Sequence, residues 1–129
     1  MRQVVFEIKK NPVDKYFFVL KDKNGELLVT SSSFSGRAQL EKCLSYVRET
    51  MQLVKVSEDN EALEEMPMLR INSKNGGEFD FSLFGLDGLL IFTSERFHCK
   101  EECLTAIEVL KKQSLDAGIY DTILQNNKY

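Results

Sequence analysis

Apolar and polar side chains alternate along the first part of the chain. Every second residue in the segments 4–8 and 16–20 is apolar, and this period of two indicates two half-buried β-strands. Pro12 lies between them and interrupts the pattern, because proline has no backbone N–H to donate. The dipeptide Asn24-Gly25 predicts a type I′ hairpin turn, in which both central residues have positive φ. A third strand is predicted over 26–30.

From about Gly36 the period changes to that of a helix. Apolar residues recur with helical spacing and form one stripe, which consists of Leu40, Cys43, Leu44, Val47 and Met51. The segment 53–57 then returns to alternation and predicts a short fourth strand. The first part of the chain is therefore predicted to be three strands, a helix and a strand.

The second part of the chain repeats this order. Strands are predicted at 69–71, 79–83 and 89–93, with Asp87-Gly88 as the second hairpin turn. A helical stripe of Cys103, Ile107 and Leu110 follows, and 117–124 contains the last strand candidate. An ungapped alignment of 17–49 with 80–112 matches the strands, the turn glycine and the Thr-Ser pair that follows the third strand. The residues that are identical in both copies are Phe18, Leu20, Gly25, Leu27, Thr30, Ser31 and Phe34. This pattern predicts a tandem duplication.

The length of 129 residues suggests a single domain. We expect repeat 1 to span about residues 3–57 and repeat 2 about 67–124, joined by an acidic linker at 58–66. A solvated connector is the preferred interpretation of this linker, and a site for a cation or a basic partner is the alternative.

The charge and the cysteine content argue against several classes of partner and location. The 17 basic and 20 acidic residues give a net charge of −3, so we expect no nucleic-acid partner, because such affinity depends on clustered Lys and Arg. No apolar run is long enough for a membrane span, and we expect no signal peptide and no membrane partner. The three cysteines have no CxxC pairing and predict reduced thiols in a cytoplasmic protein.

Candidate chemistry is sparse. His98 and Cys99 are adjacent and Cys103 follows at helical spacing, which are the residue types of a Cys-His catalytic pair or a metal site. No orienting carboxylate or second set of ligands accompanies them, and Cys103 fits the core stripe. We therefore expect no catalytic residue, no metal ligand and no cofactor, and the protein is not expected to be an enzyme.

Several short motifs resemble the YegP-like family of small bacterial proteins. In the first copy they are Tyr16–Lys21, Asn24–Glu26, Thr30-Ser31 and Val47-Arg48, and in the second Phe79–Leu83, Thr93-Ser94 and Ile107–Lys111. The resemblance implies an α+β fold of two tandem β(3)-α-β repeats. They would form one mainly antiparallel sheet with helices on one face and the last strands exchanged between repeats. The resemblance implies no established activity and no site residues. Phe17 stands where the family often has arginine.

One feature suggests an interaction. If Phe18 and Leu20 face the helices, then alternation places four apolar residues on the opposite face of the sheet, namely Phe17, Val19, Leu28 and Ile91. Such a patch indicates contact with a protein partner or a second copy. The alternative is that the acidic linker or the C-terminal tail covers it.

Two functional hypotheses follow. The first is a non-catalytic interaction module that associates with itself or another protein through this sheet face. The alternative is a small-ligand or nucleic-acid-binding domain with a groove between the repeats. That groove would be lined by basic residues, for which the candidates are Arg37, Lys42, Lys100 and Lys111.

Overall fold

The computed structural model describes residues 4–58 and 65–123. The first half contains β1 (Val5–Lys10), β2 (Tyr16–Lys21), β3 (Leu27–Ser31), α1 (Arg37–Thr50) and β4 (Lys55–Glu58). The second half contains β5 (Met68–Ser73), a 3₁₀ turn (Asn75–Gly77), β6 (Phe79–Phe84), β7 (Leu90–Ser94), α2 (Lys100–Gln113) and β8 (Gly118–Asp121). The predicted fourth and last strands are thus slightly displaced. β4 extends to Glu58, and residues 59–64 of the predicted linker lie outside the described part of the chain.

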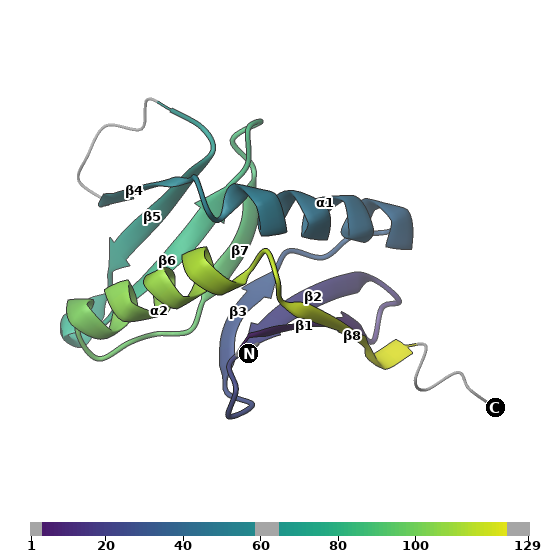
Figure 1. Ribbon diagram of the computed structural model, residues 1–129, viewed down its shortest axis with the longest axis horizontal. Coiled ribbons are helices and arrows are strands. Elements are labelled where there is room, and N and C mark those ends of the chain that lie inside the picture. Colours follow the sequence, from purple (N-terminus) through teal and green to yellow (C-terminus); the bar gives the residue numbers. More distant parts are fainter. Residues whose placement is uncertain (1–3, 59–64, 124–129) are drawn as a thin grey trace.

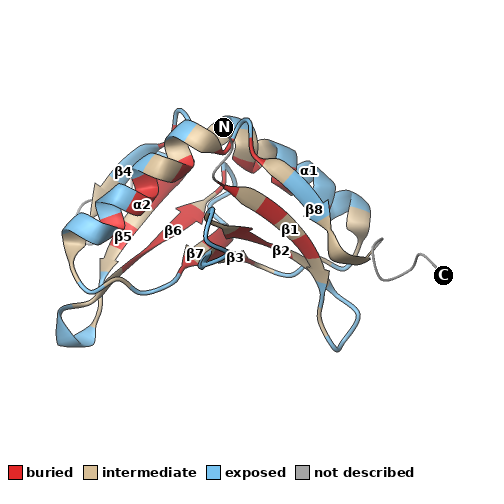
Figure 2. Ribbon diagram, turned by 60° about the horizontal axis from the view of Figure 1, so that its bottom comes forward, coloured by how far each residue is buried: buried red, intermediate tan, exposed pale blue. Residues whose placement is uncertain are grey.

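All of these strands belong to one mixed sheet of eight strands, in the order β4-β5-β6-β7-β3-β2-β1-β8. β3 and β7 pair antiparallel at its centre. The two edge strands pair in parallel, β4 with β5 and β8 with β1, so the last strand of each half lies against the first strand of the other half. Both helices lie on the same side of the sheet (Figures 1 and 2). The predicted α+β class is confirmed.

An ion pair ties each edge strand to the start of a helix. Arg37, the first residue of α1, pairs with Asp121 of β8, and Lys100, the first residue of α2, pairs with Glu58 of β4. The two pairs occupy corresponding positions in the two halves. Together with the strand ladders they attach both ends of the sheet to the helix layer.

The hydrophobic core lies between the helices and the sheet. Its largest members are four fully buried phenylalanines, namely Phe6, Phe18, Phe81 and Phe92. Their rings meet edge to face within each half, with centroids 5.7 Å apart for Phe6–Phe18 and 6.3 Å apart for Phe81–Phe92. The helices contribute the stripes that their spacing predicts, with Leu40, Leu44 and Val47 buried on α1 and Cys103, Ile107 and Leu110 on α2. Neither helix is long and apolar enough to cross a membrane, and this holds for every helix in 4–58 and 65–123.

The two hairpin turns differ in type from the prediction. Gly25 and Gly88 both have φ of 82°, but neither Asn24 nor Asp87 has positive φ, so the predicted type I′ geometry is wrong. In the first turn the Gly25 amide donates to the Asp22 carbonyl and the Asp22 amide donates to the Glu26 carbonyl. This is a three-residue loop in which a type I turn is followed by a left-handed glycine. The second turn has the same bonds, because the sequence places its glycine at the same distance from the strands.

Gly25→Val should lower the free energy of unfolding by about 1–2 kcal/mol, because a β-branched residue is strained at positive φ. The strain is purely conformational, since a Cβ at this glycine would meet no atom within 4 Å. Urea denaturation would measure the loss. Lys23→Val, at an exposed turn residue with negative φ, is the control and should change stability by only a few tenths of a kcal/mol. Equal stability of Gly25→Val and the wild type would contradict the turn geometry.

Candidate functional site

Two of the four residues of the predicted patch, Phe17 and Val19, lie on the sheet face opposite the helices. Val19 pairs with Glu7 on one side and with Thr30 on the other, and only 3% of its surface is exposed. The Glu7 carboxylate lies 3.2 Å from the Lys21 ammonium and 3.7 Å from that of Lys9. Charged side chains of β1 and β2 therefore lie beside Val19, and the uncharged Thr30 lies on its β3 side. Phe17 is half-buried beside it.

The predicted positions of Leu28 and Ile91 are wrong, because each is the extra residue of a β-bulge. Leu20 pairs with Val29 while Lys21 pairs with Leu27, so Leu28 has no partner of its own on β2. Ile91 is the extra residue in the same way between β6 and β7. An extra residue reverses the alternation of side chains from that point on. Both residues consequently pack on the helix side, Leu28 near α2 and Ile91 near α1.

The predicted apolar patch is therefore divided between the two faces of the sheet. Polar groups also occupy the part of the outer face that the second half of the chain forms. There the side-chain amide of Asn72 donates a hydrogen bond to the Asp80 carboxylate over 2.9 Å. The alternative prediction is that the linker or the tail covers the outer face. Most of these two segments, residues 59–64 and 124–129, lies outside the described part of the chain. The apolar surface of this protein must be sought on the helix side.

Two corresponding grooves run along the helices. The α1 groove, of about 480 Å³, lies between α1 and the hairpin of the second half, and its floor contains Phe34, Cys43, Tyr46 and Ile91. The α2 groove, of about 490 Å³, lies between α2 and the hairpin of the first half, and its floor contains Leu28, Phe97, Ala106 and Val109. In the ungapped alignment of the halves, each floor residue of one groove corresponds to a floor residue of the other. Each bulge residue thus forms part of a groove floor beneath the helix of the opposite half.

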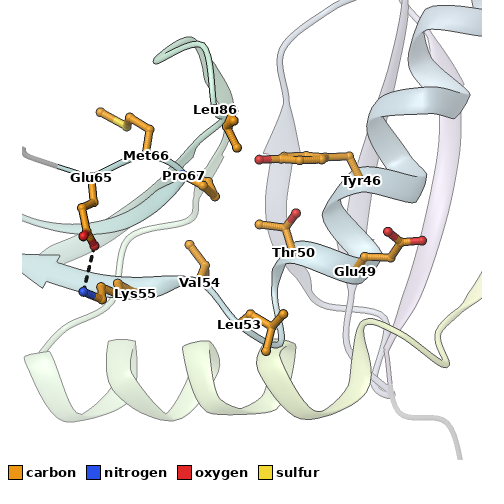
Figure 3. A pocket seen from close by; sticks show the side chains of 10 residues that line it. All are labelled: Tyr46, Glu49, Thr50, Leu53, Val54, Lys55, Glu65, Met66, Pro67 and Leu86. Carbon is orange, nitrogen blue, oxygen red and sulfur yellow. Dashed lines mark ion pairs between the residues drawn. The ribbon is translucent and has the colours of Figure 1, made fainter.

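A third and larger groove, of about 730 Å³, continues from the α1 groove (Figure 3). It lies between the C-terminal end of α1 and the chain around β4 and β5, and Tyr46 and Leu86 line both grooves. The Tyr46 side chain points across the space toward Leu86 and Pro67 (Figure 3). At the edge, the Lys55 ammonium lies 2.8 Å from the Glu65 carboxylate. The hydrogen bond between them raises the pKa of Lys55 and lowers the pKa of Glu65.

Exposed leucines line these grooves or lie on the adjoining hairpin: Leu53 and Leu86 line the 730 Å³ groove, and Leu89 is on the same hairpin as Leu86. Leu53 is 84% exposed, Leu86 is 70% exposed and Leu89 is 68% exposed. We call Leu53, Leu86, Leu89 and the adjoining Tyr46 and Pro67 the leucine surface. The first hairpin has Lys23 and Glu26 at the positions of Leu86 and Leu89. The sequence analysis did not identify this surface, although leucines in a tight turn, where polar residues are usual, are a signal that could have revealed it.

The basic residues proposed for a groove between the repeats do not come together. Arg37 and Lys100 form the ion pairs with the edge strands. Lys111 donates to the Val54 carbonyl over 2.7 Å and so links α2 to the first half. Lys42 alone of the four lines the α1 groove. Three of these cations therefore have intramolecular structural partners.

The cysteines are all free thiols. Cys103 is buried in the core, and burial raises its pKa to about 11. Cys43 is half-buried in the α1 groove, where burial and, to a smaller extent, the charge of Asp87 raise its pKa to about 11. Cys99 precedes α2 as its N-cap residue. Within 4–58 and 65–123, no group of three or more His, Cys, Asp and Glu side chains is arranged to hold a metal ion.

Native Cys43 should react with iodoacetamide about a hundredfold more slowly at neutral pH than a thiol of ordinary pKa, because only the thiolate is nucleophilic. The ordinary pKa of a cysteine thiol is 9.0, and its increase to about 11 in Cys43 leaves correspondingly less thiolate at any pH below both values. Its rate should rise with pH until about 11. Peptide mass spectrometry after timed alkylation measures each cysteine separately, with the urea-unfolded protein as the control. A native rate for Cys43 equal to the unfolded rate would refute this.

Comparisons with known proteins agree with this fold. The family model of a domain of unknown function, DUF1508, matches the chain twice, over residues 13–58 and 74–121. The chain is 26% identical over 116 residues to the UPF0339 protein YegP of Shigella flexneri, covering 90% of this chain and 94% of that protein. YegP of Escherichia coli O157:H7 matches with the same identity and coverage.

Two solution NMR structures are similar in fold. The protein of unknown function yegP from E. coli has a TM-score of 0.76 and 22% identity, and the match covers 94% of each chain. The UPF0339 protein SO3888 from Shewanella oneidensis has a TM-score of 0.77 and 18% identity, with 92% of this chain and 91% of that chain covered. At these identities the structural matches concern the fold alone. Since the family model covers most of the chain in two segments, the chain belongs to the DUF1508 family, to which the YegP-like resemblance of its motifs pointed.

Proposed function

We propose that this protein is a non-catalytic interaction module that forms a homodimer through the leucine surface. The observation that carries the proposal is the exposure of three leucines, between 68% and 84%: Leu53 and Leu86 line the 730 Å³ groove, and Leu89 lies on the same hairpin as Leu86. Contiguous exposed apolar surface of this kind is typical of protein–protein contacts. In the divided patch, by contrast, Val19 is only 3% exposed and Phe17 is half-buried.

The arrangement of the leucine surface suits a second copy of the same chain. The hairpin with Leu86 and Leu89 projects next to the groove between Tyr46, Leu53 and Pro67. In a two-fold dimer each copy presents the same surface, so the hairpin of one copy can enter the groove of the other and the reverse. Burying one leucine fully contributes about 1.5–3 kcal/mol, part of which is offset by the entropy lost on association.

The test is the molar mass in solution, measured by light scattering over a wide range of concentration. Wild type should approach twice the monomer mass of 14.8 kDa as the concentration rises. The double variant Leu86→Asp/Leu89→Asp should stay monomeric with an unchanged circular dichroism spectrum, because both side chains lie outside the core. Lys23→Asp, at the corresponding position of the first hairpin, is the matched control and should dimerise like wild type. A monomeric wild type at the highest soluble concentration, or a dimeric double variant, would refute the proposal.

A second candidate function is the binding of a small apolar ligand in the 730 Å³ groove. The specific observation is the Tyr46 hydroxyl, which is buried at the groove and has no hydrogen-bond partner among the described residues. The groove volume lies within the range of small-molecule sites, about 300–1,000 Å³. A monomeric wild type that binds the fluorescent probe anilinonaphthalene sulfonate saturably, with binding lost in Leu53→Asp, would favour this function over the dimer.

The remaining assignments are part of the same proposal. We propose that the chain is one domain of two duplicated β(3)-α-β units that exchange their last strands, which the double match of the family model and the parallel edge pairings support. We place it in the cytoplasm on account of its free thiols. Nucleic acid is not among the proposed partners, since acidic residues outnumber basic ones and three of the candidate cations are engaged within the fold.

A further inference from the structure

The α2 groove has an apolar floor and an acidic rim. We propose that it binds a basic amphipathic segment of a partner protein, with apolar side chains on the floor and lysine or arginine side chains at the rim. This site is separate from the leucine surface, because none of the residues that line the α2 groove belongs to that surface.

The rim is built from two elements on opposite sides of the floor. Asp22 and Glu26 come from the hairpin of the first half, and Glu101 and Glu102 come from the first turn of α2. No lysine or arginine lines the groove. The floor residues Leu28, Phe97 and Val109 are only partly buried. A segment lying along this floor would therefore meet carboxylates on both sides.

These carboxylates retain capacity for a partner. Asp22 accepts hydrogen bonds from the amides of Asn24 and Glu26 through Oδ1, and Glu102 accepts one from the His98 amide through Oε1. Those bonds shape the turn and the helix start but bring no positive charge. Within the part of the chain that the structure describes, none of the four carboxylates forms an ion pair with a lysine or arginine.

The α1 groove provides an internal comparison. At the positions of Asp22, Glu26, Glu101 and Glu102 the other half has, in the same order, Gly85, Leu89, Ala38 and Gln39. Both grooves have an apolar floor between a helix and the hairpin of the other half, but the four acidic rim residues occur in the α2 groove alone. The common fold therefore does not require the charges. The combination of an acidic rim and an apolar floor in the α2 groove favours a partner segment that carries both basic and apolar side chains.

The probe is a short synthetic peptide of leucine and lysine, patterned to form an amphipathic helix, titrated into the isotopically labelled full chain. Amide NMR shifts should change around Leu28, Thr105 and Val109, and affinity should fall with added salt, which screens the exposed rim charges. The variant Glu26→Gln/Glu101→Gln should bind about tenfold more weakly, as expected for the loss of two exposed charge contacts. Asp87→Asn/Glu49→Gln removes one carboxylate from the α1 groove and one from the 730 Å³ groove, and it should bind like wild type.

A converse variant tests whether the rim is sufficient. Ala38→Glu/Gln39→Glu transfers the helix part of the acidic rim to the α1 groove, and new peptide-dependent shifts should then appear around Cys43 and Tyr46. Equal affinity of wild type and Glu26→Gln/Glu101→Gln, or shifts confined to other parts of the chain, would overturn the proposal. So would a simple alkylammonium ion that binds as tightly as the peptide, because the groove would then be a small-cation site. The leucine-surface dimer is measured independently by molar mass, so either idea can fail alone.

Discussion

Phe81→Ala should lower the free energy of unfolding by about 3–5 kcal/mol, the range for removing a fully buried phenylalanine. Phe81 lies under α2, where its ring meets Phe92 edge to face and stacks on Phe97 with centroids 6.1 Å apart. The substitution removes the aromatic contacts and leaves a cavity that the surrounding strands cannot fill without moving. Because Phe97 also lines the α2 groove, the groove floor should loosen as well.

Urea denaturation monitored by far-ultraviolet circular dichroism measures this loss of stability, since the chain has no tryptophan for fluorescence. Phe17→Ala is the matched control, because it deletes the same ring from the opposite face of the same sheet. Phe17 is half-buried, and its loss should cost at most about 1 kcal/mol. If both variants lost equal stability, Phe17 would be a core residue beneath the linker or the tail, and the assignment of the two sheet faces would be incorrect.

Replacing both serines of the repeated Thr-Ser pair, Ser31→Ala/Ser94→Ala, should lower the free energy of unfolding by about 2–6 kcal/mol. The Ser31 hydroxyl accepts a hydrogen bond from the buried Phe18 amide over 2.9 Å, and Ser94 accepts one from the Phe81 amide over the same distance. Alanine leaves both amides buried without a partner, at a cost of about 1–3 kcal/mol each. The two sites have no shared partner, so the effects should be nearly additive.

The single variants and Ser33→Ala provide the controls. Ser33 is exposed in the same segment and its substitution should be nearly neutral. Amide hydrogen exchange should also show faster exchange at Phe18 in Ser31→Ala and at Phe81 in Ser94→Ala. A double variant as stable as wild type would mean that water replaces the hydroxyl at both sites.

The serine contacts explain why the Thr-Ser pair occurs in both halves. β3 lies between β2 and β7 and pairs with both, but its regular pairing with β2 ends at Thr30, whereas on the β7 side the Ser32 amide still donates to the Ile91 carbonyl. The serine hydroxyl occupies the gap in the ladder before Phe34 and Tyr16 pair again. The matching positions made these residues visible in the sequence, but their role depends on the interruption of the ladder between β2 and β3.

Local sequence patterns were sufficient to predict the strands and helices. The alternation of segments 4–8 and 16–20, the helical stripes and the position of Gly25 depend on neighbouring residues, whose geometry follows from the strand and helix periods. The type of the turn was not predictable, because Asn-Gly is compatible with more than one hairpin loop. The strand register selected the longer loop.

The candidate surfaces depended on tertiary structure. Alternation placed Leu28 and Ile91 on the outer face, but a bulge arises from pairing with a distant strand and leaves no mark on the period of the strand itself. Likewise, the grooves form only where the helix of one half meets the hairpin of the other. The sequence by itself determined the elements and their repetition, because these follow from local spacing. Only the tertiary structure decided which apolar and acidic side chains share a surface, because contacts between residues far apart in the chain set the faces.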